Sequence, residues 1–442
     1  MARRSISLVA ARKAGILGPV MRSVWMMLWL CACSGGVQSG SAPRRLAAEA
    51  EAEAEAEAEA EAAAEAEAAA EAEAEAEAEA AAEVEAAAET EADGEVIIGA
   101  SGDVLVHLKV IESAAQNGGF EHVFAGLREL TAQDTLAFAN LETPLSMRVP
   151  PVTGDPPILG APAEVAAALA SAGLDVLSVA NNHAFDQMSA GLTDTLGALE
   201  GAGLTAVGAD MEAATAAGPV IVERNGMRIA FLAFTERLNR GPVANGRYDQ
   251  PALFVPDDAC AKVAAARERA DLVVVSVHWS FDFAEGPFRG QRRHAHALVE
   301  HGADLVLGHG PHILQRIERL ESPRGDAVIA YSLGNLVSNQ GLRYFIGRRR
   351  LPDTLHPAVI LPTTRDGVWL RTGFTRDGDR LRLTTFEAIP LWTENNFLQW
   401  AQGQAPTLDI RVRPLRAFSE RTRAERIAPI TEALGDAVRV FP

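Results

Sequence analysis

The chain has 442 residues, enough for one large domain or two to three ordinary ones, and 48% of them are hydrophobic, which permits a sizeable core. Its net charge of −19 is concentrated in residues 49–95, which contain 20 acids and no Lys or Arg. The remainder, from Val96 onward, has 33 bases and 39 acids. This mild acidity argues against a nucleic-acid-binding protein held by phosphate contacts.

The N-terminus has the features of an export signal. Basic residues precede an apolar stretch at 23–32, which is shorter than the ~20 residues that a membrane span needs and fits the core of a secretory signal. The order Leu30-Cys31-Ala32-Cys33 resembles a bacterial lipoprotein lipobox, which implies cleavage before Cys33 and lipidation of its thiol. An ordinary signal peptide with an incidental cysteine is the alternative.

We therefore expect a signal peptide at 1–32, an anchor-proximal segment at 33–46 and an extracytoplasmic lipoprotein held at a membrane, in the periplasm or at the cell surface. Residues 47–95 are almost purely Ala and Glu. Both residues favour helix, but Glu at every second position places like charges four residues apart, and the segment has no apolar stripe. We interpret it as a solvated spacer, with cation binding as the alternative.

From Val96 onward, short apolar runs alternate with helical patterns, which predicts a mainly α/β fold. Six of these runs are followed directly by polar side chains. The runs lie at 96–98, 136–139, 176–180, 272–277, 305–308 and 328–332. The polar residues that follow them are Asp103, Asn140, Glu142, Asn181, Asn182, His183, Asp186, His278, His309, His312 and Asn335.

Sites in open α/β sheets form at the carboxyl ends of the strands, so these side chains should meet at one edge. Oxygen and imidazole donors without a thiolate suit Mn, Zn, Fe or Mg. The apolar spacing predicts helices between the strands, and the Asn225-Gly226 pair predicts a tight hairpin. The helices are expected at 121–130, 162–172, 192–201, 257–270 and 289–301.

After residue 341 the pattern is weaker. It predicts antiparallel strands at 357–363, 368–374 and 380–388 and a helix at 416–437. No clear linker is present, so we expect one domain with its main part at 96–342 and a C-terminal β/α extension of the same domain at 343–442.

Six motifs together resemble the bacterial capsule-synthesis CapA/PgsA-type family. They are G-D at 102–103, N-L-E at 140–142, N-N-H-x-x-D at 181–186, H-W at 278–279, G-H-x-P-H at 308–312 and S-L-G-N at 332–335. That family is linked to poly-γ-glutamate capsule production. The resemblance, which covers roughly residues 96–337, implies a metallophosphatase-like (calcineurin-like) layered sandwich of mixed β-sheets flanked by helices, with the C-terminal region appended.

The resemblance also implies roles for the residues. A divalent metal would be held by Asp103, Glu142, Asn182, His278, His309 and His312, and His183 would be the catalytic general acid. Substrate binding or ligand orientation would fall to Asn140, Asn181, Asp186 and Asn335. Two departures from the wider phosphoesterase pattern imply that one of two metal positions is built differently: Leu105 replaces a histidine, and two residues rather than one separate His309 from His312.

Structural alternatives stay open at this point, with Asp103, Asn181, Asp186 and Asn335 as turn residues and Glu142 as a helix cap or salt-bridge residue. Surface or packing positions are expected for the remaining histidines, His107, His122, His294, His296, His301 and His356. Residues 348–350, all Arg, are expected to be solvated.

Two functions from different classes fit this sequence. One is a metal-dependent hydrolase of a phosphoester or related bond in surface-polymer synthesis. The other is a non-catalytic, membrane-anchored accessory that binds or exports an anionic polymer beside capsule-synthesis membrane proteins. The chain has no G-x-x-x-x-G-K-[ST] phosphate loop, which disfavours ATP-driven polymerisation, and no G-x-S-x-G elbow.

Overall fold

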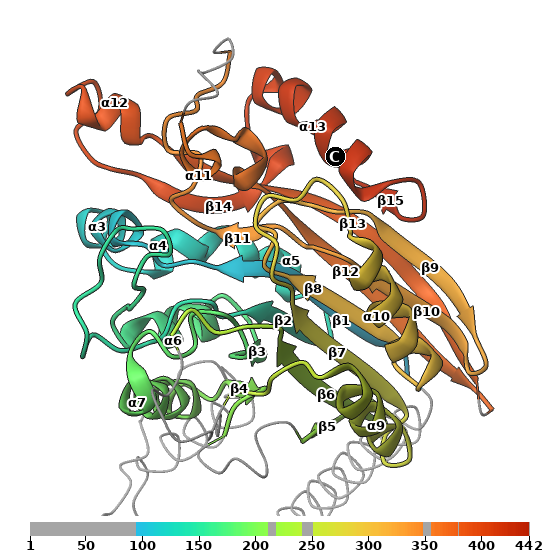
Figure 1. Ribbon diagram of the computed structural model, residues 1–442. Coiled ribbons are helices and arrows are strands. Elements are labelled where there is room, and N and C mark those ends of the chain that lie inside the picture. The colour runs from blue at the N-terminus through green and yellow to red at the C-terminus, as the bar shows by residue number, and fades with distance from the viewer. Residues whose placement is uncertain (1–93, 211–217, 241–250, 348–354, 379, 442) are drawn as a thin grey trace, which may run out of the picture. The chain divides into compact units, whose positions relative to one another are not determined.

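The computed structural model describes residues 94–210, 218–240, 251–347, 355–378 and 380–441 (Figure 1). The chain divides into two compact units, Met1–Glu85 and Ala86–Pro442, and all described residues belong to the second. The predicted signal peptide, Cys33, nearly all of the Glu/Ala spacer and the arginine run at 348–350 lie outside the described residues. Within the described part, no helix is long and apolar enough to cross a bilayer.

The described strands form one hydrogen-bonded system that contains two parallel blocks. The first block contains β1 (Val96–Val104), β2 (Leu136–Asn140), β3 (Val176–Ser178) and β4 (Thr205–Val207). The second block contains β6 (Met227–Thr235), β7 (Leu272–His278), β8 (Leu305–His309) and β10 (Gly325–Ala330). Antiparallel strands β5 (Val220–Arg224) and β9 (Ile317–Ser322) pair with β6 and β10.

The C-terminal region joins the two blocks. The hairpin of β12 (Asp366–Asp377) and β13 (Arg380–Asn395) lies between β1 and β10, because β12 pairs with β1 and β13 contacts β10. Two further strands, β14 (Ile410–Pro414) and β15 (Arg439–Val440), pair with β13. The predicted C-terminal extension therefore supplies strands in the middle of the sheet order.

The two parallel blocks face each other across a shared apolar core. Phe138 of β2 stacks on Phe231 of β6, with ring centroids 6.1 Å apart. Alternate residues of both blocks join this core, as the period of two along a strand requires. Among them are Ile98, Phe138, Val176, Ile229, Phe231, Val274, Leu305 and Val328.

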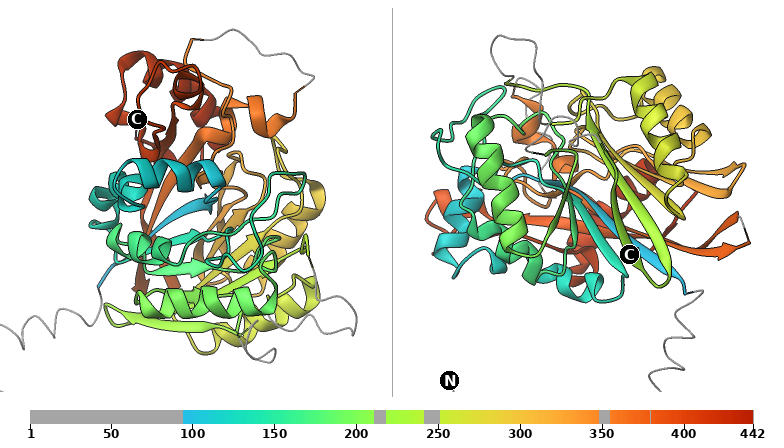
Figure 2. Two further views of the ribbon diagram at one scale, coloured as in Figure 1. Left: turned by 90° about the vertical axis from the view of Figure 1, so that its left-hand side faces the viewer. Right: turned by 90° about the horizontal axis from the view of Figure 1, so that it is seen from below.

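Helices cover the outer faces of both blocks (Figure 2). The first block carries α3 (Leu108–Gln116), α4 (Glu121–Phe124), α6 (Glu164–Ser171) and α7 (Met188–Gly201). The second block carries α9 (Pro256–Arg267) and α10 (Arg289–Glu300). The expected layered α/β sandwich, with mixed strands flanked by helices, is confirmed.

All six predicted strands with polar ends are confirmed, and so is the hairpin, where Asn225 and Gly226 both have positive φ (49° and 70°). The expected helix at 121–130 is broken into α4, a 3-10 turn at Ala125–Leu127 and α5 (Arg128–Thr131).

The predicted strand at 357–363 is wrong. It forms α11 (Pro357–Ile360) and a 3-10 turn at Pro362–Arg365, because each proline presets the first turn of a helix. The helix expected at 416–437 is present as α13 (Glu420–Leu434), and α12 (Phe397–Ala401) was not predicted.

Replacing Phe231 by alanine should destabilise the domain by about 3–5 kcal/mol, because the truncation leaves a cavity between the two blocks. The matched control is Phe281→Ala, since Phe281 is 53% exposed, and we expect a loss of no more than about 1 kcal/mol there. Equilibrium urea unfolding of both variants measures the difference. Equal losses at the two sites would contradict the two-block core.

Candidate metal centre

The inner faces of three strands change from apolar to polar at their carboxyl ends. In β7, Leu272 and Val274 point into the shared core, and His278, an even number of residues further along, points to the same face of the strand. The same alternation places His309 beyond the core residues of β8 and Asn140 beyond those of β2. The parallel register brings His278 level with His309, so these ends meet at one edge, as the sequence predicted.

Strand β1 delivers its carboxylate through a bulge. Ala100 pairs with Phe138 but Asp103 pairs with Asn140, so β1 has one extra residue over this interval. The bulge requires glycine at 102, because a Cβ there would lie 1.9 Å from the carbonyl oxygen of Gly334. The extra residue aims Asp103 at the ends of the neighbouring strands, where its Oδ1 accepts a 2.8 Å hydrogen bond from Asn140.

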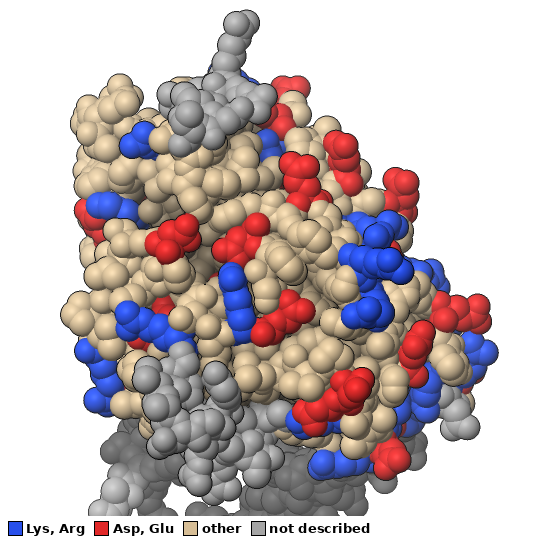
Figure 3. Space-filling model, viewed as in Figure 1, with Lys and Arg blue, Asp and Glu red and all other residues tan. Residues whose placement is uncertain are grey.

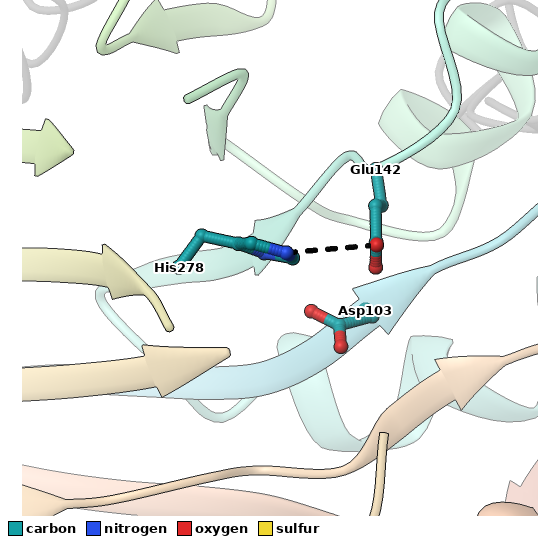
Figure 4. A group of neighbouring side chains, drawn as sticks. All are labelled: Asp103, Glu142 and His278. Carbon is teal, nitrogen blue, oxygen red and sulfur yellow. Dashed lines mark ion pairs between the residues drawn. The ribbon is translucent and has the colours of Figure 1, made fainter. Parts of the chain in front are cut away.

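Asp103, Glu142 and His278 form the centre of the site (Figure 4). One ligand atom from each lies within 4.8 Å of the others, and His278 Nε2 is 3.7 Å from Glu142 Oε1. All three side chains are buried, with exposures of 0%, 0% and 2%. They come from β1, from the segment just after β2 and from the end of β7, and they point toward one another.

Two further histidines surround this group. His309 Nδ1 lies 3.4 Å from Asp103 Oδ1, and His312 Nδ1 lies 3.1 Å from Asp103 Oδ2 and 3.8 Å from Glu142 Oε2. The loop between them turns tightly, since Gly310 and His312 have φ of 100° and 60°. The backbone N–H of Gly310 also donates to Asp103 Oδ2 over 3.2 Å.

Several buried atoms of this cluster have no hydrogen-bond partner among the described residues: both carboxylate oxygens of Glu142 and both ring nitrogens of His309. Leaving such groups unpaired is costly, so their presence indicates a missing partner. A divalent cation satisfies carboxylate and imidazole lone pairs together. The residues therefore fit a metal, and the Asp103–Glu142–His278 group could bind one.

The pKa shifts within the cluster also favour a bound cation. Burial raises the pKa of Glu142 well above its usual range, against the opposing charge of His312. Burial would also raise the pKa of Asp103, but the ring of His309, 3.4 Å away, and the hydrogen bond and charge of His312 outweigh burial and hold that pKa well below normal. For His312, the charge of Glu142 and the hydrogen bond to Asp103 outweigh burial and raise the pKa to about 10.

Burial lowers the pKa of His278 well below normal, against the charge of Asp103, and the charges of His312 and His309 add to the lowering. Without a cation, the cluster thus keeps a proton on His312 at neutral pH. A cation that takes His312 as a ligand must displace that proton, so its affinity should rise with pH.

The other predicted site residues surround the cluster. Asn181 donates to the carbonyl oxygen of Leu141 over 2.8 Å and holds Asn140 at 3.4 Å. Asn335 Oδ1 lies 3.2 Å from His312 Nδ1, and the Asn335 amide nitrogen donates to the carbonyl oxygen of Thr364. Both amides are buried and hydrogen-bonded to neighbours of the cluster, and Asn181 does so from a bend in the chain.

His183 and Asp186 form a buried pair, with Nδ1 and Oδ2 2.6 Å apart. The same Oδ2 accepts from the backbone N–H of Leu159 over 2.7 Å. Asp186 therefore orients His183, one of the two roles that its spacing allowed. Asn182 is next to this pair, and its Oδ1 has no hydrogen-bond partner among the described residues.

A cavity of about 780 Å³ opens onto the site and is lined by Asn182, His183 and His312. Sequence reasoning missed Arg237 and Asn239, which also line it. They follow the end of β6, where the same strand-end rule would have found them. Asn239 donates its backbone N–H to the carbonyl oxygen of Asn182 over 2.7 Å, and its amide nitrogen lies 3.3 Å from His183 Nε2.

Two further histidines line this cavity. His356 is exposed, in agreement with the expected surface position. His107 was expected at a surface or packing position and is half-buried at the cavity wall, because α3 begins shortly after β1 and its first residues lie at the same sheet edge as Asp103. On the face shown in Figure 3, acidic and basic side chains are interspersed.

The fold and the cluster together define an α/β sandwich with a buried carboxylate–imidazole site at its strand ends. The family model described as "Bacterial capsule synthesis protein PGA_cap" matches residues 97–340, more than half of the chain. The chain belongs to this family, as the six motifs predicted.

Two curated relatives support the assignment. The chain is 30% identical over 293 residues to the PGA biosynthesis protein CapA of Bacillus subtilis (strain 168), which covers 61% of this chain and 74% of that protein. It is 35% identical over 187 residues to the capsule biosynthesis protein CapA of Bacillus anthracis, covering 41% of this chain and 44% of that one. The alignment thus spans less than half of the second relative.

Two solved structures are similar at low identity. A hypothetical protein from Thermus thermophilus is 18% identical and matches 67% of this chain and 98% of its own, with a TM-score of 0.40. The calcineurin-like phosphoesterase YfkN from Bacillus subtilis is 12% identical and matches 67% and 90%, with a TM-score of 0.39.

Replacing Glu142 by glutamine should lower divalent-metal affinity by more than about tenfold, because a neutral amide replaces a charged ligand. Isothermal titration of metal-stripped protein with Mn²⁺ and Zn²⁺ measures this loss. Affinity of the wild type should also be higher on the alkaline side of neutrality than on the acid side.

The matched control is Glu112→Gln, because Glu112 lies in an ion pair on α3 with side chains about one-third exposed, and we expect its affinity to equal the wild type's. Since the raised pKa of Glu142 makes a neutral side chain acceptable there, Glu142→Gln should not weaken the metal-free fold. Equal metal binding by both variants would rule out the centre.

Proposed function

We propose that this chain is a metal-dependent hydrolase of a phosphoester or related bond, acting in the synthesis of a poly-γ-glutamate type of surface polymer. One observation carries the proposal: an imidazole oriented by a carboxylate, His183 with Asp186, lines the same cavity as His312 of the buried cluster. The printed names of the curated relatives, which concern capsule and PGA biosynthesis, support the polymer class.

The chemistry divides between the cluster and the imidazole. A divalent cation held by Asp103, Glu142 and His278, with His309 and His312 beside them, would supply Lewis-acid polarisation and a more acidic bound water. Asp186 holds His183 by Nδ1, which leaves Nε2 toward Asn239. The Asn239 amide nitrogen can only donate to Nε2, so His183 takes a proton at Nε2, and gives it to a leaving oxygen, once the Asn239 side chain has turned its nitrogen away.

The cavity also contains a cationic group suited to an anionic substrate. Arg237 is 45% exposed and lies 3.1 Å from Asp282 Oδ1, and both residues line the cavity. An exposed pair of this kind contributes little to stability, so the guanidinium is available to a phosphoryl or carboxylate oxygen.

A second candidate function is supported by a specific observation. Leu105, which stands where the wider phosphoesterase pattern has a histidine, is a buried side chain that lines the same cavity. Because an apolar side chain cannot bind a metal, the site lacks one ligand of the wider pattern. If the cluster holds a cation but catalyses no hydrolysis, the bound cation would serve to bind an anionic polymer. In that case the chain is a non-catalytic accessory of capsule-synthesis membrane proteins.

We also propose that the protein acts outside the cytoplasm, anchored to a membrane through a lipid on Cys33. The basic residues, the short apolar stretch and the Leu30-Cys31-Ala32-Cys33 order support this location. The Glu/Ala segment would then hold the domain away from the bilayer.

Replacing His183 by alanine should lower kcat for a phosphodiester by about 10²-fold or more, because the leaving oxygen loses its proton donor. The measurement is hydrolysis of bis(p-nitrophenyl) phosphate by Mn-loaded full-length protein. The control is His301→Ala, since His301 is exposed at the end of α10, and it should match the wild type.

Metal content must be measured in the same samples. A fall in kcat with unchanged metal content supports the hydrolase. Metal-replete wild type that hydrolyses no phosphomonoester or phosphodiester would contradict it and favour the accessory function.

Replacing Cys33 by alanine should abolish incorporation of labelled palmitate and move the protein from the membrane to the soluble fraction. Cys31→Ala is the matched control, because it leaves Leu30, Ala32 and Cys33 in place and should still be labelled. Labelling of the Cys33→Ala variant, or none in the wild type, would argue against the anchor.

A further inference from the structure

His107 is a cavity-lining residue that the proposed chemistry does not use. It is the residue immediately before α3 and is half-buried. Three backbone hydrogen bonds fix its position. Its N–H donates to the carbonyl oxygen of Leu105 over 2.9 Å, and its own carbonyl oxygen accepts from Val110 and Ile111 over 2.8 and 3.1 Å.

The proton position on the His107 ring follows from one contact. The backbone N–H of Asn339 donates to His107 Nδ1 over 3.2 Å. Because a backbone N–H can only donate, Nδ1 must be the acceptor, and the neutral ring carries its proton on Nε2. The structure thus selects the Nε2–H tautomer of His107.

The donor of this contact is itself held in place. The side-chain oxygen of Asn339 accepts from Asn395 over 3.1 Å, and the next residue, Gln340, donates its N–H to Ser338 Oγ over 3.2 Å. These bonds tie the loop after β11 (Asn335–Val337) to β13, so the Asn339 N–H remains directed at the imidazole.

The ring is also kept neutral. Burial and the charges of His183 and His312 lower the pKa of His107 to about 3. The described residues give Nε2 no hydrogen-bond partner, although His107 lines the cavity. A neutral imidazole with Nδ1 occupied and a proton on Nε2 has no free lone pair for a metal, but it has one N–H to donate.

We propose that His107 is a substrate-binding residue whose Nε2–H donates a hydrogen bond to an anionic phosphoryl oxygen in the cavity. The phosphoryl class rests on the proposed function; the direction of the hydrogen bond rests on the Asn339 contact alone. Asn182 and Arg237 line the same cavity and offer an amide and a guanidinium to the other oxygens of such a group.

Imidazole NMR of ¹⁵N-histidine-labelled, full-length wild type tests the tautomer without any activity. The His107 signals are assigned by their loss in His107→Gln. We expect the Nε2–H tautomer on both sides of neutral pH. An Nδ1–H tautomer, or a ring that becomes charged near neutrality, would overturn the proposal.

Calorimetric titration of the Zn-loaded protein with inorganic phosphate tests the donor. His107→Phe keeps the ring shape without nitrogen, and phosphate affinity should fall about tenfold or more, the loss of one hydrogen bond to a charged group. His107→Gln, which restores an N–H donor, should recover most of that affinity. The matched control His301→Phe, at an exposed site, should bind phosphate as the wild type does.

Three results would overturn the inference: wild type that binds no phosphate, equal affinity in His107→Phe, or loss of metal from that variant, which would make His107 a ligand. Thermal unfolding of each variant identifies misfolding, and the tautomer measurement on the wild type is independent of it. The two proposals can fail separately. If phosphate binding depends on His107 but the protein hydrolyses no phosphoester, the proposed hydrolase function is refuted and the role of His107 in binding stands.

Discussion

The structure depends on the burial of two carboxylates side by side. Asp103 and Glu142 are fully enclosed, and histidines rather than lysines or arginines approach them in the cluster. Such a pair is costly unless cations or protons compensate it, so some of the elements that end at this edge have to contribute compensating groups. This requirement explains why the carboxyl ends of β7 and β8 and the loop after β8 all present imidazoles to the same small volume.

The cluster also requires that the strand ends stay in register with one another. The C-terminal region holds them in that register. The β12–β13 hairpin lies against β1, and Gly367 of β12 bridges Gly334, which in turn accepts the N–H of Asp103. At the start of β12, Arg426 of α13 pairs with the buried Asp366. Thus the last quarter of the chain, which contributes none of the residues of the carboxylate–imidazole cluster, holds the backbone on which Asp103 depends.

Much of this arrangement could be predicted from the sequence, because it follows from local periodicity. Apolar runs identified the strands, and the polar residues after them identified the cluster. The rest depends on long-range contacts. The bulge before Asp103 arises from the pairing of β1 with β2, and the tautomer of His107 arises from Asn339, far away in the sequence. The false strand at 357–363 had apolar residues but two prolines that start short helices.

The order of strands also has a consequence for how the molecule is made. Strand β1 is synthesised near the beginning of the domain, yet one of its three neighbours, β12, emerges from the ribosome more than 260 residues later. Until then β1 has an open edge at residues 96–100, which pair with β12, whereas β10 already pairs with β8 and β9 and meets the hairpin at Gly325 alone. The region matched by the family model, 97–340, therefore leaves out the strand that pairs with this edge. A polypeptide ending at residue 340 would leave this edge of β1 free to pair with another chain, so the edge is closed only after the hairpin has been made.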